Sequence, residues 1–254
     1  MNATPPVVNA PSIGVTVVIP VYNEQEAIGE LMGEVFAALD PLQDFEVVVV
    51  DDGSEDGTHE VLSRARQRHG PRLRVLRHRA RSGQSAAMRT GILAAAHPWI
   101  ATLDGDGQND PADIPALLAA LRQPGHAPVA MICGRRRRRQ DSWLKRVSSR
   151  IANGVRRRLL RDDTLDTGCG LKVFRRELFL RLPWFDHMHR FLPALARREG
   201  AVVISQDVRH RPRTRGKSKY GVHNRLWVGI VDLIGVMWLQ RRGKVVVSDE
   251  VENR

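Results

Sequence analysis

The chain has 254 residues, of which 42% are hydrophobic and 27% charged, so it can bury a substantial core. This composition excludes a disordered chain, a collagen-like fibre and a small disulfide-stapled scaffold. Two cysteines, Cys133 and Cys169, cannot form a disulfide framework, and we expect both to be small core residues. Residues 1–14 lack the basic and apolar regions of a secretory signal, which predicts a cytoplasmic chain.

The formal net charge is +12 at pH 7, and one segment holds nearly all of it. Residues 135–161 contain eleven arginines, one lysine and a single acidic residue, whereas the rest of the chain is almost neutral. A solvated helix face is the ordinary reason for a run of charge. This density indicates instead a localised anionic partner, such as phosphate, a membrane surface or nucleic acid.

Apolar runs alternate with segments of helical periodicity through the first half of the chain. Val15–Pro20 reads as a buried strand, and Asn23 followed by Glu26 predicts a capping box at the start of a helix. One face of that helix is apolar at Ile28, Leu31, Met32, Val35, Phe36 and Leu39. Further strands are predicted at 45–50, 73–76, 99–103 and 129–133, and helices at 56–68, 85–96 and 113–121.

Strands separated by single helices predict an α/β fold with right-handed crossovers. Several strands are uniformly apolar, which is typical of a mainly parallel, twisted sheet with helices on both faces. Such sheets bind their ligands at the carboxyl ends of the strands. No G-x-G-x-x-G follows the first strand and no P-loop motif is present, so the dinucleotide-binding and P-loop classes lose their main support.

Beyond residue 134 the alternation weakens. Apolar residues at helical spacing predict an amphipathic helix at 143–159 with a basic opposite face. A strand is predicted at 202–205, followed by a basic loop at 212–220. Residues 226–239 are apolar apart from Asp232, and these 14 residues are fewer than the ~20 that span a bilayer. This C-terminal helix therefore lies either in the membrane interface or against the body of the protein.

Acidic residues gather where two predicted strands end. Asp104 and Asp106, two residues apart after a strand, should face the same side and hold a hard cation. Helix capping is the simpler alternative, and a calcium loop is disfavoured because Gly and Glu are missing at its sixth and twelfth positions. Asp51 and Asp52 follow four valines and can accept hydrogen bonds from a base or a ribose, while Ser54 or Asp56 can cap the next helix.

The motifs resemble those of a known family. The segments that carry the resemblance are Val18–Glu24, Val50–Thr58, Leu103–Gln108, Gly134–Arg136, Asp166–Gly170 and Arg213–Lys219. Together they resemble the inverting family 2 glycosyltransferases of GT-A fold, in the branch of dolichyl-phosphate mannose synthases and undecaprenyl-phosphate sugar transferases. The resemblance covers about residues 14–222, and it departs from the usual pattern at Cys169, where Ser is common, and at Lys172, where Arg is common.

The resemblance implies roles for individual residues. Residues implied to bind the nucleotide sugar are Pro20, Tyr22, Glu24, Asp52, Ser54, Gly83 and Asp104. Residues implied to hold Mg or Mn are Asp104, Asp106 and Gln108. Residues implied to bind acceptor or donor phosphate are Arg136, Arg146, Ser149, Arg213 and Ser218. Asp166 matches a family acid near the reacting centre, so the implied catalytic set is Asp104, Asp106 and Asp166.

The resemblance also implies an organisation and a location. Residues 1–13 are expected to form a flexible N-terminus, 14–134 a nucleotide-binding part, 135–222 an acceptor part and 223–254 a membrane-associating helix and tail. The implied reaction moves a sugar from a UDP- or GDP-sugar to a polyprenyl phosphate. It would take place at an anionic membrane surface, on the inner face of the cell membrane.

Other functions stay open on the residues alone. A saccharide acceptor would suit a polysaccharide synthase, but its Q-x-x-R-W signature is matched only by Gln206–His210, with His in place of Trp. The basic segment would permit nucleic-acid binding, although no zinc-finger or RRM signature is present. No cysteine pair or spaced histidine indicates zinc, and no histidine is placed as the base of a nucleophile, which disfavours a serine or cysteine hydrolase.

Overall fold

The computed structural model describes residues 13–122, 128–136, 154, 156–160, 162–212 and 222–242. Most of the basic segment lies outside these ranges, as does most of the helix predicted at 143–159, of which residues 154 and 156–159 are described and helical. Four of the predicted phosphate-binding residues also fall outside them: Arg146, Ser149, Arg213 and Ser218.

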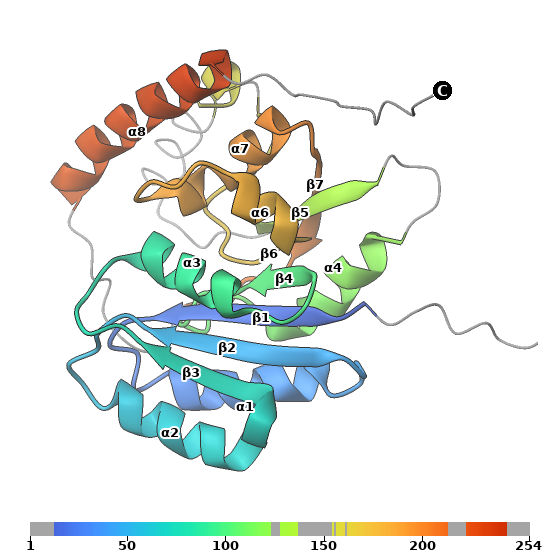
Figure 1. The fold of residues 1–254 in the computed structure, drawn as a ribbon, viewed down its shortest axis with the longest axis vertical. Helices are drawn as coiled ribbons and strands as arrows, with labels where there is room; N and C mark the ends of the chain where they lie inside the picture. Colours follow the sequence, from blue (N-terminus) through green and yellow to red (C-terminus); the bar gives the residue numbers. More distant parts are fainter. Residues whose placement is uncertain are drawn as a thin grey trace, which may run out of the picture.

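A single seven-stranded sheet forms the centre of the protein (Figure 1). In sequence the strands are β1 (Val15–Val21), β2 (Phe45–Asp51), β3 (Leu73–Arg77), β4 (Trp99–Thr102), β5 (Val129–Arg136), β6 (Lys172–Arg175) and β7 (Val202–Val208). Their spatial order is β3-β2-β1-β4-β6-β5-β7, and only β6 runs antiparallel to its neighbours. The predicted mainly parallel sheet is confirmed.

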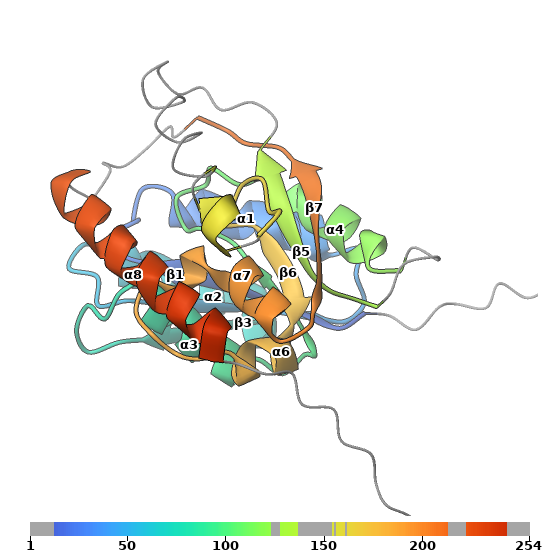
Figure 2. The ribbon, with the colours of Figure 1, turned by 90° about the horizontal axis from the view of Figure 1, so that it is seen from above.

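Helices cover both faces of the sheet, as Figures 1 and 2 show. One face carries α1 (Ile28–Leu39), α2 (Thr58–His69) and α4 (Ile114–Ala120), and the other carries α3 (Gln84–Ala94), α6 (Arg176–Arg181), α7 (Leu192–Arg198) and α8 (Val222–Arg242). Alternate residues of β1 show the division, since Val17 and Ile19 pack toward α1 whereas Val18 packs toward α3. Burial on both faces is the reason that the strands are uniformly apolar.

The start of the first helix differs from the prediction. The apolar face of α1 is buried as expected, but the helix begins at Ile28, and Ala27 at its cap makes no side-chain hydrogen bond. The predicted capping box at Asn23 and Glu26 is therefore wrong. Asn23 has a left-handed φ of 51°, and its Oδ1 accepts a hydrogen bond from the backbone N–H of Glu55. Asn23 thus joins the loops that follow β1 and β2.

The C-terminal helix α8 is apolar on two sides. Its inner side, with Leu233, Val236 and Met237, packs against the core formed by α3, α6 and α7. Its outer side exposes large apolar side chains at Trp227, Ile230, Val231, Ile234 and Trp238. Among the helices that the structure describes, none has both the length and the apolarity to cross a bilayer. The helix therefore packs on the body and also presents an apolar surface to solvent.

Candidate functional site

A cavity of about 810 Å³ opens at the carboxyl ends of β1, β2 and β4 and extends to the end of β5 and the start of β6. Its volume lies in the usual range for ligand pockets. Acidic and basic side chains both line it; we call Asp52, Asp104 and Asp106 its acidic part and Arg136, Arg156 and Lys172 its basic part. The amino end of α3, at Gly83 and Gln84, also lines the cavity, and backbone N–H groups at a helix start favour an anionic ligand.

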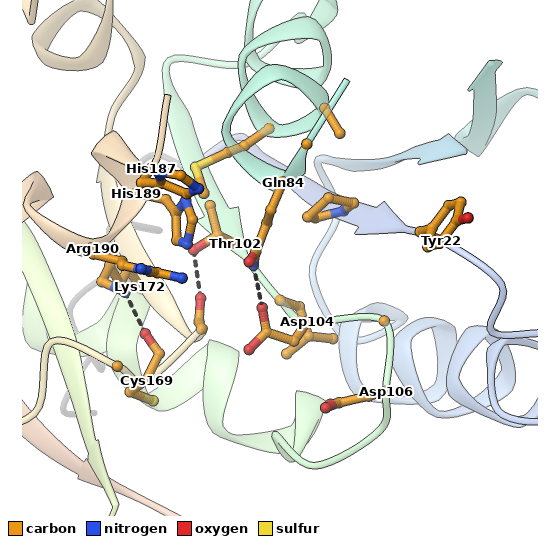
Figure 3. Close-up of a pocket in the computed structure, with 18 of the residues that line it drawn as sticks. Tyr22, Gln84, Thr102, Asp104, Asp106, Cys169, Lys172, His187, His189 and Arg190 are labelled. Atoms are coloured by element: carbon orange, nitrogen blue, oxygen red, sulfur yellow. Dashed lines mark hydrogen bonds between the residues drawn. The ribbon is translucent and has the colours of Figure 1, made fainter. Parts of the chain in front are cut away.

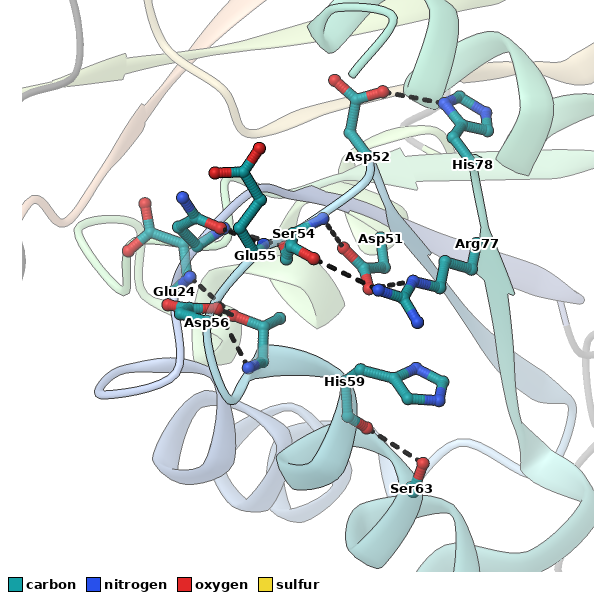
Figure 4. A network of polar contacts seen from close by, with 12 residues as sticks. Glu24, Asp51, Asp52, Ser54, Glu55, Asp56, His59, Ser63, Arg77 and His78 are labelled. Atoms are coloured by element: carbon teal, nitrogen blue, oxygen red, sulfur yellow. Dashed lines mark hydrogen bonds and ion pairs between the residues drawn. The ribbon is translucent and has the colours of Figure 1, made fainter. Parts of the chain in front are cut away.

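Asp52 lines the part of the cavity next to β1 and β2. Its Oδ1 lies 2.8 Å from His78 Nδ1 (Figure 4). The same oxygen accepts from Ser82 N, and Oδ2 accepts from Gly83 N at 2.8 Å. These contacts fix the loop that begins α3. The neighbouring Asp51 is fully buried and accepts a hydrogen bond from Ser54 N. Of this pair, therefore, Asp52 lines the cavity and Asp51 does not.

Asp104 and Asp106 follow β4, and both carboxylates point to the same side of the cavity in Figure 3. The segment forms a turn at Gly105 and Asp106 rather than the expected extended stretch, yet the side chains still converge. Gln84 Nε2 donates to Asp104 Oδ1 at 2.9 Å. On the opposite side the loop of Gly170 lies so close that a Cβ there would be 2.1 Å from Asp104 Oδ2. Asp104 is thus held between α3 and that loop.

Burial, followed by repulsion from Asp106, raises the pKa of Asp104 from 3.8 to about 6. The folded state therefore binds a proton more readily than the unfolded chain, and stability falls as pH rises from about 4 to 6. We expect Asp104→Asn to raise the free energy of unfolding by roughly 2–3 kcal/mol at pH 7.5 in metal-free buffer and to change it little at pH 3.5. Denaturant titrations of both proteins at the two pH values would measure this. An equal effect at both would contradict the pKa assignment.

The donor set at this turn fits a hard divalent cation. Two carboxylates that repel each other are the ligands that Mg²⁺ or Mn²⁺ prefers, and such ions commonly take their other ligands from water and substrate phosphate. Within the described residues no group of three or more His, Cys, Asp or Glu side chains gathers around one point. The pair therefore suits an ion shared with a ligand better than an ion enclosed by protein.

The basic part of the cavity contains a charge pair. Arg136, at the end of β5, donates from Nε to Asp166 Oδ2 at 2.7 Å and from NH2 to Asp166 Oδ1 at 2.8 Å. The side chains are only 13% and 10% exposed. Lys172 on β6 donates to the backbone oxygen of Cys169, and Arg156 pairs with Asp162 at 3.1 Å. All three cations line the same cavity as Asp52.

A segment after α6 closes a further side of the cavity. Asp186, His187, His189 and Arg190 all line it. The sequence places no histidine near a nucleophile, but His189 Nδ1 lies 2.7 Å from Ser85 Oγ. Ser85 is 1% exposed and does not line the cavity, so this pair fastens the segment to α3 and presents no nucleophile to a substrate.

The structure brings most of the expected residues together. Those that line the cavity are Pro20, Tyr22, Glu24, Asp52, Gly83, Asp104, Asp106, Arg136 and Asp166. Two described residues do not line it. Ser54 is buried and its Oγ accepts from Asn23 N, while Gln108 donates from its backbone N–H to Asp106 Oδ1. The buried free thiols of Cys133 and Cys169 agree with the expected core role.

Several lining residues were not among the predicted site residues. They are Arg81, Ser82, Gln84, Arg156, Lys172, Asp186, His187, His189 and Arg190. Of these, Lys172 carried a signal, because it is a departure from the family pattern next to the Asp166 loop. Arg81 packs over the Tyr22 ring at 4.4 Å, a contact between two loops that no local pattern predicts.

Comparisons with known proteins identify the family of the chain. The glycosyl transferase family 2 model matches residues 16–182. Undecaprenyl-phosphate 4-deoxy-4-formamido-L-arabinose transferase of Edwardsiella ictaluri is 38% identical over 82% of this chain and 63% of its own length. Dodecaprenyl-phosphate galacturonate synthase of Rhizobium johnstonii is 35% identical over 91% of this chain and 68% of its own. The chain thus spans about two thirds of these relatives.

Solved structures share the fold at lower identity. Glucosyl-3-phosphoglycerate synthase from Mycobacterium tuberculosis, in complex with Mn²⁺, uridine diphosphate and phosphoglyceric acid, superposes with a TM-score of 0.66. It is 17% identical, and the match covers 91% of this chain and 79% of that one. The same enzyme in complex with Mg²⁺ and uridine diphosphate gives a TM-score of 0.65. With its fold, its acidic strand ends and these matches, the chain belongs to glycosyl transferase family 2.

Proposed function

We propose that this protein transfers a sugar from a nucleotide sugar to a polyprenyl phosphate, with inversion at the anomeric carbon. The observation that carries the proposal is that one cavity holds both kinds of charge. Asp52, Asp104 and Asp106 line it together with Arg136 and Lys172, and these two cations act against the raised pKa of Asp104. An anionic acceptor can then meet the anomeric carbon within one site. The two relatives' names, both polyprenyl-phosphate sugar transferases, support this substrate class.

In this proposal the acidic part receives the donor. Tyr22, Glu24 and Asp52 would contact the nucleoside, and the amino end of α3 would face the diphosphate. Asp104 and Asp106, with Gln108 supporting the turn through its backbone, would hold Mg²⁺ or Mn²⁺. Such an ion neutralises charge on a departing diphosphate. Asp104 also stays hydrogen-bonded to Gln84, which fixes the position of its carboxylate in the cavity.

The basic part would receive the lipid phosphate. A phosphate monoester is already anionic at neutral pH, so its attack needs little help from a general base. Both oxygens of Asp166 accept hydrogen bonds from Arg136, which suits a positioning role better than proton removal. Residues 14–134 would thus serve mainly the donor and residues 135–222 mainly the acceptor, with β6 and β7 of the latter joined to the same sheet.

A direct assay tests the proposal. The full chain is incubated with undecaprenyl phosphate, Mg²⁺ or Mn²⁺, and a panel of labelled UDP- and GDP-sugars that includes UDP-galacturonate, and the products are extracted into organic solvent. We expect label in the organic phase with at least one donor, and its loss on addition of a chelator. Label that remains in water with every donor, or that moves to a saccharide acceptor instead, would overturn the proposal.

We also propose that the outer side of α8 binds the cytoplasmic face of the membrane. Trp227, Ile234 and Trp238 expose 69%, 61% and 58% of their surface, and Arg241 and Arg242 follow at the end of the helix. Apolar side chains flanked by tryptophan and arginine are typical of interfacial helices. A lipid acceptor would require this contact, because its phosphate lies at the membrane surface.

Replacing Trp227, Ile234 and Trp238 together by serine should lower binding to anionic lipid vesicles at least tenfold. The reason is that each side chain would otherwise transfer apolar surface from water to lipid, worth ~1 kcal/mol or more. Sedimentation with vesicles measures the effect, and the thermal midpoint should stay unchanged because these side chains are exposed. Leu93→Ser on α3, which removes another exposed apolar side chain, is the matched control. Equal vesicle binding by the triple variant would contradict the proposed surface.

A further inference from the structure

The acidic residue of α8 lies on the inner side of the helix, next to the cavity wall. Asp232 is only 15% exposed, and its Oδ2 lies 3.3 Å from His187 Nδ1. That oxygen is buried and accepts no hydrogen bond that meets normal geometry from the described residues. Burial raises the pKa of Asp232, whereas His187 and Arg190 act against the rise. A largely buried carboxylate with one oxygen that has an ion pair but no hydrogen bond destabilises a fold, so its presence in an otherwise apolar segment calls for a reason.

His187 is the contact that Asp232 makes with the cavity. Its backbone φ is 61°, a left-handed conformation that is uncommon outside glycine. The backbone N–H of His187 donates to Asp186 Oδ1 at 2.8 Å, and the imidazole Nε2 lies 3.6 Å from Asp186 Oδ2. The imidazole therefore lies between two carboxylates, one on its own loop and one on α8. A strained residue of this kind persists only when its surroundings hold it.

The loop held in this way reaches the donor part of the cavity. Asp186 Oδ1 would be 3.4 Å from a Cβ at Gly83, and Gly83 N in turn donates to Asp52. Figure 3 shows His187 and His189 together on one wall of the cavity, and Asp104 at the end of the Gln84 side chain. The contacts thus run from α8 through His187 and Asp186 to the loop that Asp52 holds.

We infer that Asp232 is a positioning residue for sugar transfer: through His187 it holds the Asp186–Arg190 segment in the wall of the cavity. The inference rests on the proposed function and adds a second role to α8, which then completes the active site as well as binding the membrane. Asp232 does not line the cavity, so it acts through His187 and not on the substrate.

The decisive variant is Asp232→Leu. Leucine matches the apolar neighbours Leu233 and Val236, favours a helix and removes the unsatisfied carboxylate, so the thermal midpoint should stay equal or rise. Transfer to a short, water-soluble prenyl phosphate should nevertheless fall about tenfold in kcat/KM. Stability and activity that change in opposite directions distinguish positioning from a merely structural role. Asp232→Glu should recover part of the activity.

A double-mutant cycle tests the route of the effect. His187→Asn removes the imidazole but keeps a residue that tolerates the left-handed conformation. If Asp232 acts through His187, the double variant should lose no more activity than His187→Asn alone. Multiplied losses would overturn the inference, as would unchanged kcat/KM in Asp232→Leu. Gly235→Ala, on the same helix at a position where an added Cβ meets nothing within 4 Å, serves as control and should leave transfer to the soluble acceptor unchanged.

The experiment separates this inference from the proposed function. If the unaltered protein transfers sugar to no prenyl phosphate, the proposed function fails, and Asp232 then has no reaction to support. If the unaltered protein is active and Asp232→Leu is equally active, only the positioning role fails. Vesicle sedimentation should be the same for Asp232→Leu and the unaltered protein, because the outer side of α8 is intact.

Discussion

Asp104→Ala is expected to reduce sugar transfer about 10³-fold while the protein remains folded. Asp104 is buried between Gln84 and the Gly170 loop, and its raised pKa shows that its charge is poorly compensated by the protein itself. In the proposed function a cation held there would supply that compensation and would stabilise the charge on the departing diphosphate, and loss of such stabilisation costs 10²–10³-fold or more. Initial rates of label transfer at saturating Mn²⁺ measure the effect.

Glu55→Gln is the matched control for this variant. Glu55 is another acid at a strand end, but it is exposed and does not line the cavity. It should retain activity within twofold. Asp104→Ala with activity close to that of the unaltered protein, or transfer that continues at full rate in excess chelator, would remove the metal assignment from this turn.

Arg136→Lys and Asp166→Asn are each expected to lower kcat/KM for the lipid phosphate about 100-fold. Lysine cannot reproduce the two parallel hydrogen bonds of the guanidinium, and asparagine presents an N–H₂ group to a cation. Breaking one partner of a largely buried pair typically costs several kcal/mol, because the other charge is left uncompensated. The KM of the nucleotide sugar should change less than threefold. Steady-state rates with each substrate varied in turn separate the two effects.

The neighbouring pair of Arg135 and Asp207 offers a control of the same chemistry. Its side chains are 44% and 23% exposed, and exposed ion pairs contribute little. Arg135→Lys should therefore retain activity within twofold. If Arg136→Lys raised the KM of the nucleotide sugar as strongly as that of the lipid phosphate, Arg136 would belong to the donor part of the cavity instead.

The first two strands and the acidic residues at the strand ends were predictable because their signals are local. Val15–Val21 and Phe45–Asp51 are apolar runs of strand length that end in acids, and the strand ends of a parallel sheet meet at one edge. Asp52, Asp104 and Asp106 could therefore be placed together from the sequence alone. The predicted capping box at Asn23 is wrong because a local signature cannot show that the Asn23 side chain accepts a hydrogen bond from Glu55 in a second loop.

The second half of the site depended on contacts between distant segments. The antiparallel strand β6 has four residues, too few for a periodic signal, yet it places Lys172 in the cavity. Trp227 and Leu233 are both apolar in the sequence, and only packing decides that one is exposed and the other contacts the core.

The sequence by itself determined the fold class, the family resemblance and the acidic strand ends, because periodicity and motif spacing are properties of neighbouring residues. Only the tertiary structure decided that Asp166 accepts both hydrogen bonds of Arg136 and that Asp232 meets His187, which lies 45 positions before it. The physical reason is that such pairings form when separate elements pack around one cavity. The residues between two partners do not encode how close the partners lie in the folded protein.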